Sequence, residues 1–251
     1  MKVGDRVFTV NWGNGRHNGD DVPVVGGGFA EYSLVNASKV AIIPDGVSFE
    51  EAAAISLTGS TAYQSLYEEL NVPKGADAKV LVLGGSGGVG QCAVQLIKYY
   101  GGKVITTCST RTLPFVTKLE PDKIINYGEH AWEEDPEVQG IDFVFDTVGT
   151  PGSFEKAKRI LKPTGGFLSI ANGEAGLKPK AHPPLSYAAL FCLRNSVDTL
   201  ECLIDLVAKK KLKVFIDEEF PFTKEGIVQI FKKQGSGKSI GKNILRITSV
   251  I

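Results

Sequence analysis

Between residues 79 and 170, short apolar segments alternate with longer segments whose apolar residues recur every three or four positions. The short segments predict strands over 80–83, 104–107, 123–126, 143–145 and 167–170, and the longer ones predict helices over 89–100, 113–119 and 154–161. Strands 80–83 and 143–145 are unbroken apolar runs, which is typical of strands buried on both faces of a parallel sheet. Repeated strand–helix units predict a right-handed, doubly wound α/β domain.

The sequence on either side of this alternation has a different pattern. Residues 1–43 predict short strands over 3–10 and 29–35, separated by a loop over 11–28 that is rich in Gly, Asn and Asp. Ser48 and Glu51 form a capping box that predicts a helix start, and a second helix is predicted over 61–70. After a loop rich in Gly and Pro, the pattern predicts a strand over 188–193, a helix over 197–209, an extended segment over 214–222, a helix over 226–233 and a strand over 242–248.

Composition and charge exclude several classes of protein. The chain has 251 residues, of which 43% are hydrophobic and 22% charged, which excludes a disordered or low-complexity protein. The 28 basic residues balance the 28 acidic ones, so no net field favours nucleic acid or an anionic membrane. No apolar run reaches the roughly 18 residues of a membrane-spanning helix, and the first residues have no signal-peptide pattern. We therefore expect a cytoplasmic protein, or an organellar one if a targeting segment is missing.

The cysteine and histidine positions argue against a metal site. A zinc site needs clustered thiolate or imidazole donors, and no pair of cysteines forms a C-x-x-C motif here. The residues concerned are scattered along the chain: Cys92, Cys108, Cys192, Cys202, His17, His130 and His182. We expect no bound metal, and four cysteines are too few for a disulfide scaffold, which favours a reducing compartment.

A glycine-rich loop, Gly85-Ser-Gly-Gly-Val-Gly90, satisfies the pattern G-x-G-x-x-G between the predicted strand 80–83 and helix 89–100. In this context the first glycine permits a tight turn, the second lets the backbone approach a pyrophosphate, and the third lets helix and strand pack closely. The loop lacks the Gly-Lys-Ser/Thr ending of a nucleotide-hydrolysing P-loop. It therefore predicts a dinucleotide site, the alternative being a glycine-rich turn without a ligand.

The end of the second predicted strand favours NADP(H). A site for NAD usually carries an acidic residue here that binds the ribose 2′-hydroxyl, and residues 104–119 contain none. They offer Ser109 and Arg111, whose hydroxyl and guanidinium groups can hold a 2′-phosphate. The alternative for Arg111 is a solvent-facing residue in the first turn of the next helix.

Further motifs occur in order along the chain: Val3-Gly-Asp-Arg-Val, Gly27-Gly-Phe-Ala-Glu-Tyr, Ile43-Pro-Asp-Gly-Val-Ser-Phe-Glu-Glu-Ala-Ala, Thr61-Ala-Tyr-Gln and the glycine loop 84–90. Together they resemble the zinc-independent quinone oxidoreductase branch of the medium-chain dehydrogenases/reductases. The likeness covers nearly the whole chain, ending with Gly241-Lys-Asn-Ile-Leu. The zinc-dependent branch usually carries a lobe with four cysteines, and the loop 11–28, where it would fall, has none.

The resemblance implies an α/β fold with a Rossmann doubly wound parallel sheet and a partial GroES-like β domain. The expected domains are 1–57 (GroES-like), 58–212 (NADP(H)-binding) and 213–251 (return to the catalytic domain). The implied activity is NADPH-dependent hydride transfer to a small-molecule substrate, a quinone or an α,β-unsaturated carbonyl (enone or alkenal), in possible dimers formed through the sheet edges. Family members normally have several dozen further residues before the Gly-Asp-Arg-Val strand, so we expect an N-terminally truncated chain. The alternative is a catalytically impaired NADPH-binding or interaction protein.

The resemblance also assigns cofactor-binding residues. They are Thr61 near the nicotinamide, Ser86, Gly87, Gly88 and Val89 at the pyrophosphate, Ser109, Arg111 and Tyr127 at the 2′-phosphate, Val148, Gly149, Ser169, Ile170 and Ala171 along the adenosine and nicotinamide halves, and Lys242 and Asn243 in a segment that returns to the cleft. Each has an alternative: Tyr127 as a half-buried aromatic, Ser169 facing a neighbouring helix, Thr61 as an N-cap, and Lys242 on the exposed side of an edge strand. No catalytic acid is assigned, although Tyr63 and Tyr32 are candidates by composition.

Overall fold

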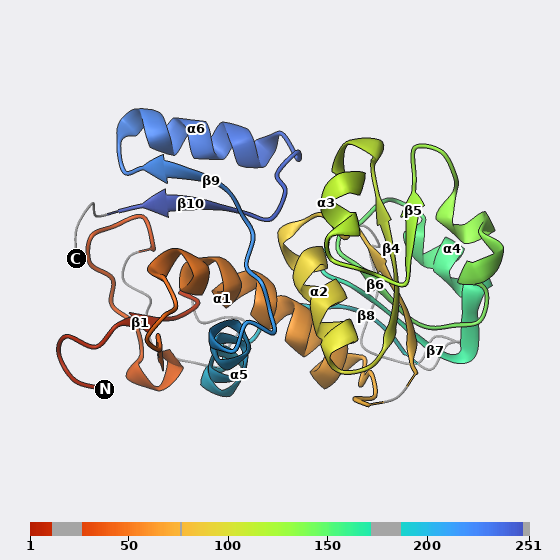
Figure 1. The fold of residues 1–251 in the computed structure, drawn as a ribbon, viewed down its shortest axis with the longest axis horizontal. Helices are drawn as coiled ribbons and strands as arrows, with labels where there is room; N and C mark the ends of the chain where they lie inside the picture. Colours follow the sequence, from red (N-terminus) through yellow and green to blue (C-terminus); the bar gives the residue numbers. More distant parts are fainter. Residues whose placement is uncertain (12–26, 76, 172–186, 248–251) are drawn as a thin grey trace. The chain divides into compact units, whose positions relative to one another are not determined.

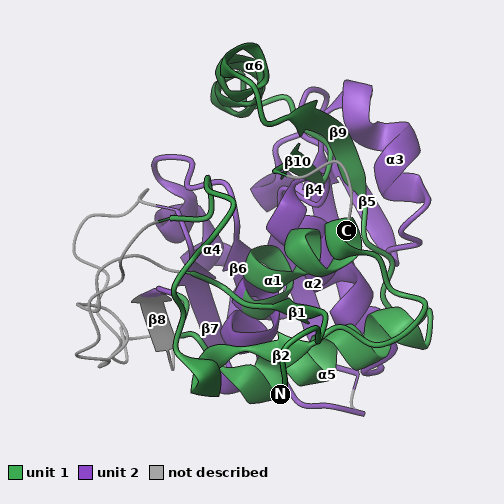
Figure 2. Ribbon diagram, turned by 90° about the vertical axis from the view of Figure 1, so that its left-hand side faces the viewer, with its two compact units in different colours: residues 1–60, 193–251 green, residues 61–192 purple. Residues whose placement is uncertain are grey.

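The computed structural model describes residues 1–11, 27–75, 77–171 and 187–247 (Figure 1). The chain divides into two compact units, residues 1–60 with 193–251 and residues 61–192 (Figure 2). The expected domain boundaries at 57/58 and 212/213 stay predictions. The predicted loop 11–28 and the loop after residue 170 lie mostly outside the described residues. No helix within the described ranges is long and apolar enough to cross a membrane.

The second unit contains one parallel sheet of six strands in the order β5-β4-β3-β6-β7-β8. The strands are β3 (Lys79–Leu83), β4 (Lys103–Cys108), β5 (Lys123–Asn126), β6 (Ile141–Asp146), β7 (Leu161–Ser169) and β8 (Tyr187–Leu190). All five strands predicted between residues 79 and 170 are present, and the sixth begins one residue before its predicted range and ends earlier. This is the strand order of a doubly wound Rossmann sheet, so that prediction is confirmed.

The helices that connect these strands are α2 (Gly88–Tyr99), α3 (Leu113–Thr117) and α4 (Ser153–Ile160). They lie where the 3.6-residue periodicity predicts, although α3 ends two residues early, before Glu120 with its positive φ of 53°. Phe154 and Ile160 of α4 belong to the same buried cluster as Leu81 and Phe167 of the sheet. The ring centroids of Phe154 and Phe167 are 5.1 Å apart. Burial between the two helical layers explains why residues 80–83 of β3 and 143–145 of β6 form unbroken apolar runs.

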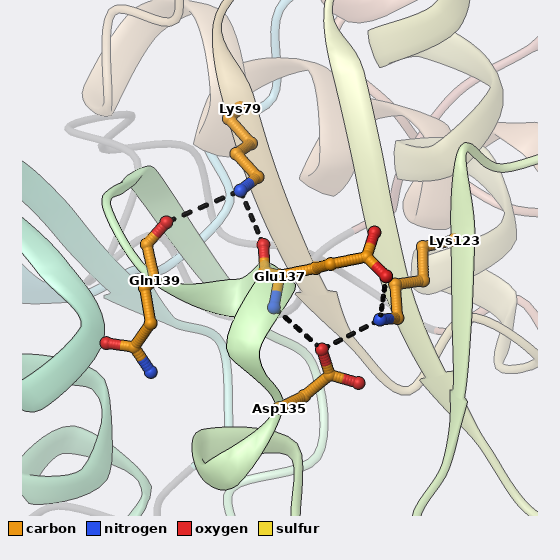
Figure 3. Close-up of polar contacts among 5 residues, drawn as sticks. All are labelled: Lys79, Lys123, Asp135, Glu137 and Gln139. Carbon is orange, nitrogen blue, oxygen red and sulfur yellow. Dashed lines mark hydrogen bonds and ion pairs between the residues drawn. The ribbon is translucent and has the colours of Figure 1, made fainter.

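The connection from β5 to β6 is held by two lysines at the amino end of the sheet (Figure 3). It contains two 3₁₀ turns, η4 (Trp132–Glu134) and η5 (Pro136–Val138). Lys123 Nζ lies 2.7 Å from Asp135 Oδ1 and 2.8 Å from Glu137 Oε1, while Lys79 Nζ donates to the main-chain oxygens of Glu137 and Gln139. Asp135 Oδ1 also accepts from the Glu137 N–H at 2.9 Å, capping η5. We call these five residues the lysine clip.

We expect Asp135→Asn to weaken the acid dependence of stability. The hydrogen bond from Lys123, together with that from the Glu137 N–H, holds the pKa of Asp135 below its ordinary value. A lowered folded-state pKa gives stability that is present at neutral pH and is lost as pH falls below about 4. Since the side chains of Lys123 and Asp135 are both partly exposed, Asp135→Asn should lower the free energy of unfolding at pH 7 by only about 0.5–1 kcal/mol. Urea unfolding at pH 7 and pH 3 measures this, with Asp45→Asn as a charge-matched control. An equal pH dependence in wild type and Asp135→Asn would contradict the prediction.

The capping box at Ser48 is confirmed, but the two predicted helices are one. Ser48 N donates to Glu51 Oε2 at 2.9 Å, and Glu51 N donates to Ser48 Oγ at 3.1 Å. The helix α1 (Phe49–Tyr63) then continues into a π-helical segment, η2 (Gln64–Glu69), so the break expected before residue 61 is wrong. The intervening hydroxyls bond back to the helix, as when Thr58 Oγ1 donates to the Ala54 oxygen at 2.8 Å. Gly59 is enclosed there, because an added Cβ would lie 2.7 Å from Ile55.

The first unit contains two small sheets and three helices in its described part. The antiparallel pair is β1 (Val7–Phe8) with β2 (Ala41–Ile42), and the parallel pair is β9 (Ile216–Pro221) with β10 (Lys242–Arg246). The helices are α5 (Val197–Ala208), α6 (Lys224–Gly235) and the greater part of α1. A 3₁₀ turn, η1 (Ala37–Lys39), comes directly before β2.

Two strand predictions in this unit need correction. The strand expected over 3–10 is reduced to Val7 and Phe8, and residues 29–35 form no strand. Phe29, Tyr32 and Leu34 are exposed at 53%, 91% and 65%. Their apolar character therefore does not reflect burial against a neighbouring strand, which is the assumption behind the strand prediction.

Candidate cofactor-binding site

The candidate site lies at the carboxyl end of the six-stranded sheet. In open parallel sheets, ligands bind where the strand order reverses, outside the carboxyl ends of the strands. Here β3 is the first strand of the unit and pairs with β4 on one side and β6 on the other. The loops after these three strands therefore meet at the position where such a ligand binds.

The loop after β3 is the glycine-rich loop, and it is held by β4. Gly84, with φ +87°, donates its N–H to Thr107 Oγ1 at 3.0 Å, and Gly85 N donates to the Thr107 oxygen at 3.0 Å. The helix α2 then begins at Gly88 with no acidic residue in its first turn. Since the first N–H groups of a helix lack intrahelical partners, this end of α2 can bind an anion.

The three glycines of the motif have different surroundings. A Cβ on Gly85 would lie 2.3 Å from Thr106 Oγ1, and a Cβ on Gly90 would lie 2.1 Å from the Gly84 oxygen. A Cβ on Gly87 would meet only the Gly84 oxygen, at an ordinary 3.6 Å. Gly85 and Gly90 are therefore required by packing within the protein, whereas the space beside Gly87 remains for a ligand.

The loops after β4 and β5 lie side by side and carry the residues expected at the 2′-phosphate. Cys108 pairs with Asn126 in the sheet, and Tyr127 N donates to the Cys108 oxygen at 3.0 Å, so Ser109 and Tyr127 follow paired positions. Ser109 begins a 3₁₀ turn, η3 (Thr110–Thr112), in which Arg111 is exposed. Tyr127 is 59% exposed, so its alternative as a half-buried aromatic stays open, as does the solvent-facing alternative for Arg111. Burial raises the pKa of the Cys108 thiol, which stays protonated at neutral pH.

The loop after β6 is organised by Asp146, a fully buried carboxylate. Its Oδ1 accepts from the N–H groups of Val148 at 2.9 Å and Gly149 at 3.0 Å, and its Oδ2 accepts from Ser153 Oγ at 2.8 Å. Thr147 Oγ1 donates to the Leu83 oxygen at 2.6 Å, which joins this loop to the end of β3. The sequence prediction named Val148 and Gly149 but missed Asp146, although an acidic residue directly after a buried apolar run is a usable signal.

The loop after β7 starts at Ser169, whose hydroxyl is fully buried. Ser169 Oγ donates to the Ala171 oxygen at 2.9 Å and lies 3.5 Å from Asp146 Oδ2. Ile170 N donates to the Asp146 oxygen at 3.1 Å. The side chain of Ser169 thus shapes its own loop rather than facing a neighbouring helix. The N–H groups of Ile170 and Ala171 are both engaged within the protein, by the Asp146 oxygen and by Ser169 Oγ.

The remaining predicted residues belong to other elements. Thr61 is buried inside α1, so its N-cap alternative is wrong. Lys242 and Asn243 begin β10 in the first unit, where Asn243 Nδ2 donates to Ser239 Oγ at 2.9 Å. Their part in the site stays a prediction. Across the part of the chain that the structure describes, no group of His, Cys, Asp or Glu side chains is arranged to hold a metal ion.

Comparison with known proteins adds a family and relatives. A family model described as "Zinc-binding dehydrogenase" matches residues 119–245. The 2-methylene-furan-3-one reductase of Solanum lycopersicum is 33% identical over 98% of this chain, and the chloroplastic NADPH-dependent alkenal/one oxidoreductase of Arabidopsis thaliana is 28% identical over 98%. The chain spans 58% of the length of each. The structure of the quinone oxidoreductase from Coxiella burnetii matches with a TM-score of 0.81 and 26% identity, over 99% of this chain and 74% of that one.

Proposed function

The chain belongs to the zinc-binding dehydrogenase family of the medium-chain dehydrogenase/reductase superfamily, and on that premise we propose that it is an NADPH-dependent oxidoreductase. The proposed reaction is hydride transfer to a quinone or an α,β-unsaturated carbonyl. The names of the tomato and Arabidopsis relatives, a 2-methylene-furan-3-one reductase and an alkenal/one oxidoreductase, support this substrate class. The observation that carries the proposal is the glycine loop after β3, which opens a helix end without acidic residues, while the turn after the neighbouring strand β4 carries the basic residue Arg111.

The residues at the carboxyl end of the sheet fit a dinucleotide. The backbone N–H groups of residues 88–90 would hold the pyrophosphate, because the space beside Gly87 admits a close approach and no carboxylate lies in the first turn of α2. When bound, NADPH supplies the hydride, and the protein orients the nicotinamide and limits access of water. The backbone of residues 148, 149, 170 and 171, fixed by Asp146 and Ser169, would line the rest of the dinucleotide.

The preference for NADPH over NADH belongs to the same proposal. Ser109 and Arg111 follow β4, where a site for NADH would place a carboxylate, and Tyr127 follows the neighbouring strand β5. A guanidinium binds a phosphate through charge-assisted hydrogen bonds and gains little from a neutral ribose hydroxyl. Dimer formation and a cytoplasmic location remain predictions.

We expect Arg111→Ala to raise the dissociation constant for NADPH about tenfold to a hundredfold, because it removes one charge-assisted contact to phosphate. The dissociation constant for NADH should change less than about twofold, since the ribose diol carries no charge. Fluorescence titration with both coenzymes measures this. Lys118→Ala removes the same charge after α3, at an exposed position, and is the matched control. Equal affinity of the wild-type chain for NADPH and NADH would overturn the coenzyme assignment.

The activity itself is tested by following NADPH absorbance with a panel of quinones and enones. We expect consumption of NADPH that depends on the acceptor and falls in Arg111→Ala through a higher KM for NADPH. Tight NADPH binding without turnover across the panel would reject the oxidoreductase proposal while leaving the binding site intact.

A further inference from the structure

Asn126, the last residue of β5, joins the loops that follow β4 and β5. Its Nδ2 donates to Thr110 Oγ1 at 2.8 Å and to Glu129 Oε1 at 2.6 Å, and its Oδ1 accepts from the Gly128 N–H at 3.1 Å. Only 7% of the residue is exposed, although Thr110 and Glu129 lie at the surface. A single buried amide therefore makes contacts in both loops that carry the proposed 2′-phosphate residues.

The orientation of this amide is fixed by its partners. The Glu129 carboxylate is an acceptor and requires the NH₂ group, whereas the Gly128 N–H is a donor and requires the oxygen. Thr110 Oγ1 consequently receives a hydrogen bond from Asn126. The Thr110 hydroxyl proton is left to point toward a different acceptor, and Thr110 stands between Ser109 and Arg111.

The Asn126 amide also forms a hydrogen bond to the carboxylate of Glu129. Glu129 follows Tyr127 by two residues, and a carboxylate beside a 2′-phosphate would repel it. The bond to Asn126 holds one Glu129 oxygen at a defined place, and the Gly128 N–H bond fixes the turn that carries Tyr127. When several side chains bind one phosphate, each must be held in place, because a displacement of about 1 Å in a contacting group loses most of its contribution to binding.

We propose that Asn126 is the positioning residue for coenzyme choice: by tying Thr110 to the turn at residues 127–129, it places the two loops so that together they accept the 2′-phosphate. This inference rests on the proposed function, in which Ser109, Arg111 and Tyr127 surround that phosphate. It adds Thr110 as a hydroxyl donor toward the phosphate. Asn126 itself acts through the loops it joins.

The test compares the ratio of the NADPH and NADH dissociation constants in wild type, Asn126→Ala and Thr110→Val. Asn126→Ala should lower the preference for NADPH about tenfold with little change for NADH, because a lost positioning bond is felt only where the phosphate binds. Thr110→Val should lower the preference for NADPH over NADH several-fold. Thermal unfolding is recorded alongside, since a purely structural residue would change the melting temperature and leave the ratio unchanged.

Asp122→Ala is the matched control. Asp122 lies before β5, and its Oδ2 accepts from the Val104 N–H at 2.8 Å, so it joins the same two strands at their opposite end. We expect this variant to lose stability and keep the coenzyme ratio. An unchanged ratio in Asn126→Ala, or an equal fall in Asp122→Ala, would overturn the inference. If Asn126→Ala does not fold, an unchanged ratio in Thr110→Val overturns it instead.

The wild-type titration separates this inference from the proposed function. A wild-type chain that binds NADPH no better than NADH overturns the coenzyme assignment before any variant is measured. A wild-type preference for NADPH that survives in Asn126→Ala overturns only the role of Asn126.

Discussion

Gly90→Ala is expected to lower the free energy of unfolding by about 3 kcal/mol or to prevent folding. The added Cβ would lie 2.1 Å from the oxygen and 2.8 Å from the carbonyl carbon of Gly84, which are backbone atoms that no rotamer change can move aside. Alanine in a helix gains about 1 kcal/mol over glycine, which is too little to offset that overlap. Urea unfolding measures the change.

Gly87→Ala is the matched control for this variant. Residue 87 has a φ of −73°, which suits alanine, and its Cβ would have only an ordinary contact at 3.6 Å. We expect its stability to stay within about 0.5 kcal/mol of wild type, whereas its NADPH affinity should fall about tenfold, because the methyl group would occupy space proposed for the pyrophosphate. A Gly90→Ala variant as stable as Gly87→Ala would contradict the described turn.

Asp146→Ala is expected to cost about 3 kcal/mol of stability and to weaken NADPH binding. The change removes the acceptor for two backbone N–H groups and one hydroxyl, at a residue that is fully buried, and leaves these donors without their partner. The loop after β6 would then lose the bonds that fix Val148 and Gly149. Urea unfolding and NADPH titration on the same samples measure both effects.

Two further variants separate the contributions of the individual hydrogen bonds to Asp146. Ser153→Ala removes one of the three donors and should cost about 1 kcal/mol. Asp146→Asn keeps an acceptor for Val148 and Gly149, so we expect its NADPH affinity to remain close to wild type. The role of Asp146 would be rejected if Asp146→Ala were no more destabilised than Ser153→Ala.

The sequence predicts the six-stranded sheet because its signals are local. Apolar runs such as 80–83 and 143–145, with a glycine motif at one strand end, need no knowledge of distant contacts. The capping box at Ser48 is predicted for the same reason, since both of its residues lie within one turn. These signals also predict where the glycine loop lies in the fold.

Contacts between distant residues account for what the sequence does not predict. The bond between Asn126 and Thr110 joins residues 16 positions apart and depends on the pairing of Cys108 with Asn126. The sequence predicts two separate helices here, whereas α1 runs without a break through Gly59, which packs closely against the side chains of Ile55 and Leu203. Residues 29–35 have a strand-like composition, yet no strand forms there.

The lysine clip and the Asn126 bonds lie at opposite ends of one short strand, β5. Lys123 begins that strand and Asn126 ends it, three residues later, which in an extended chain is about 10 Å. Substitutions this far apart with no shared partner generally add within about 0.5 kcal/mol. The losses of stability caused by substitutions in the lysine clip and at Asn126 are therefore expected to be close to additive, so each end of this strand can be altered and measured on its own.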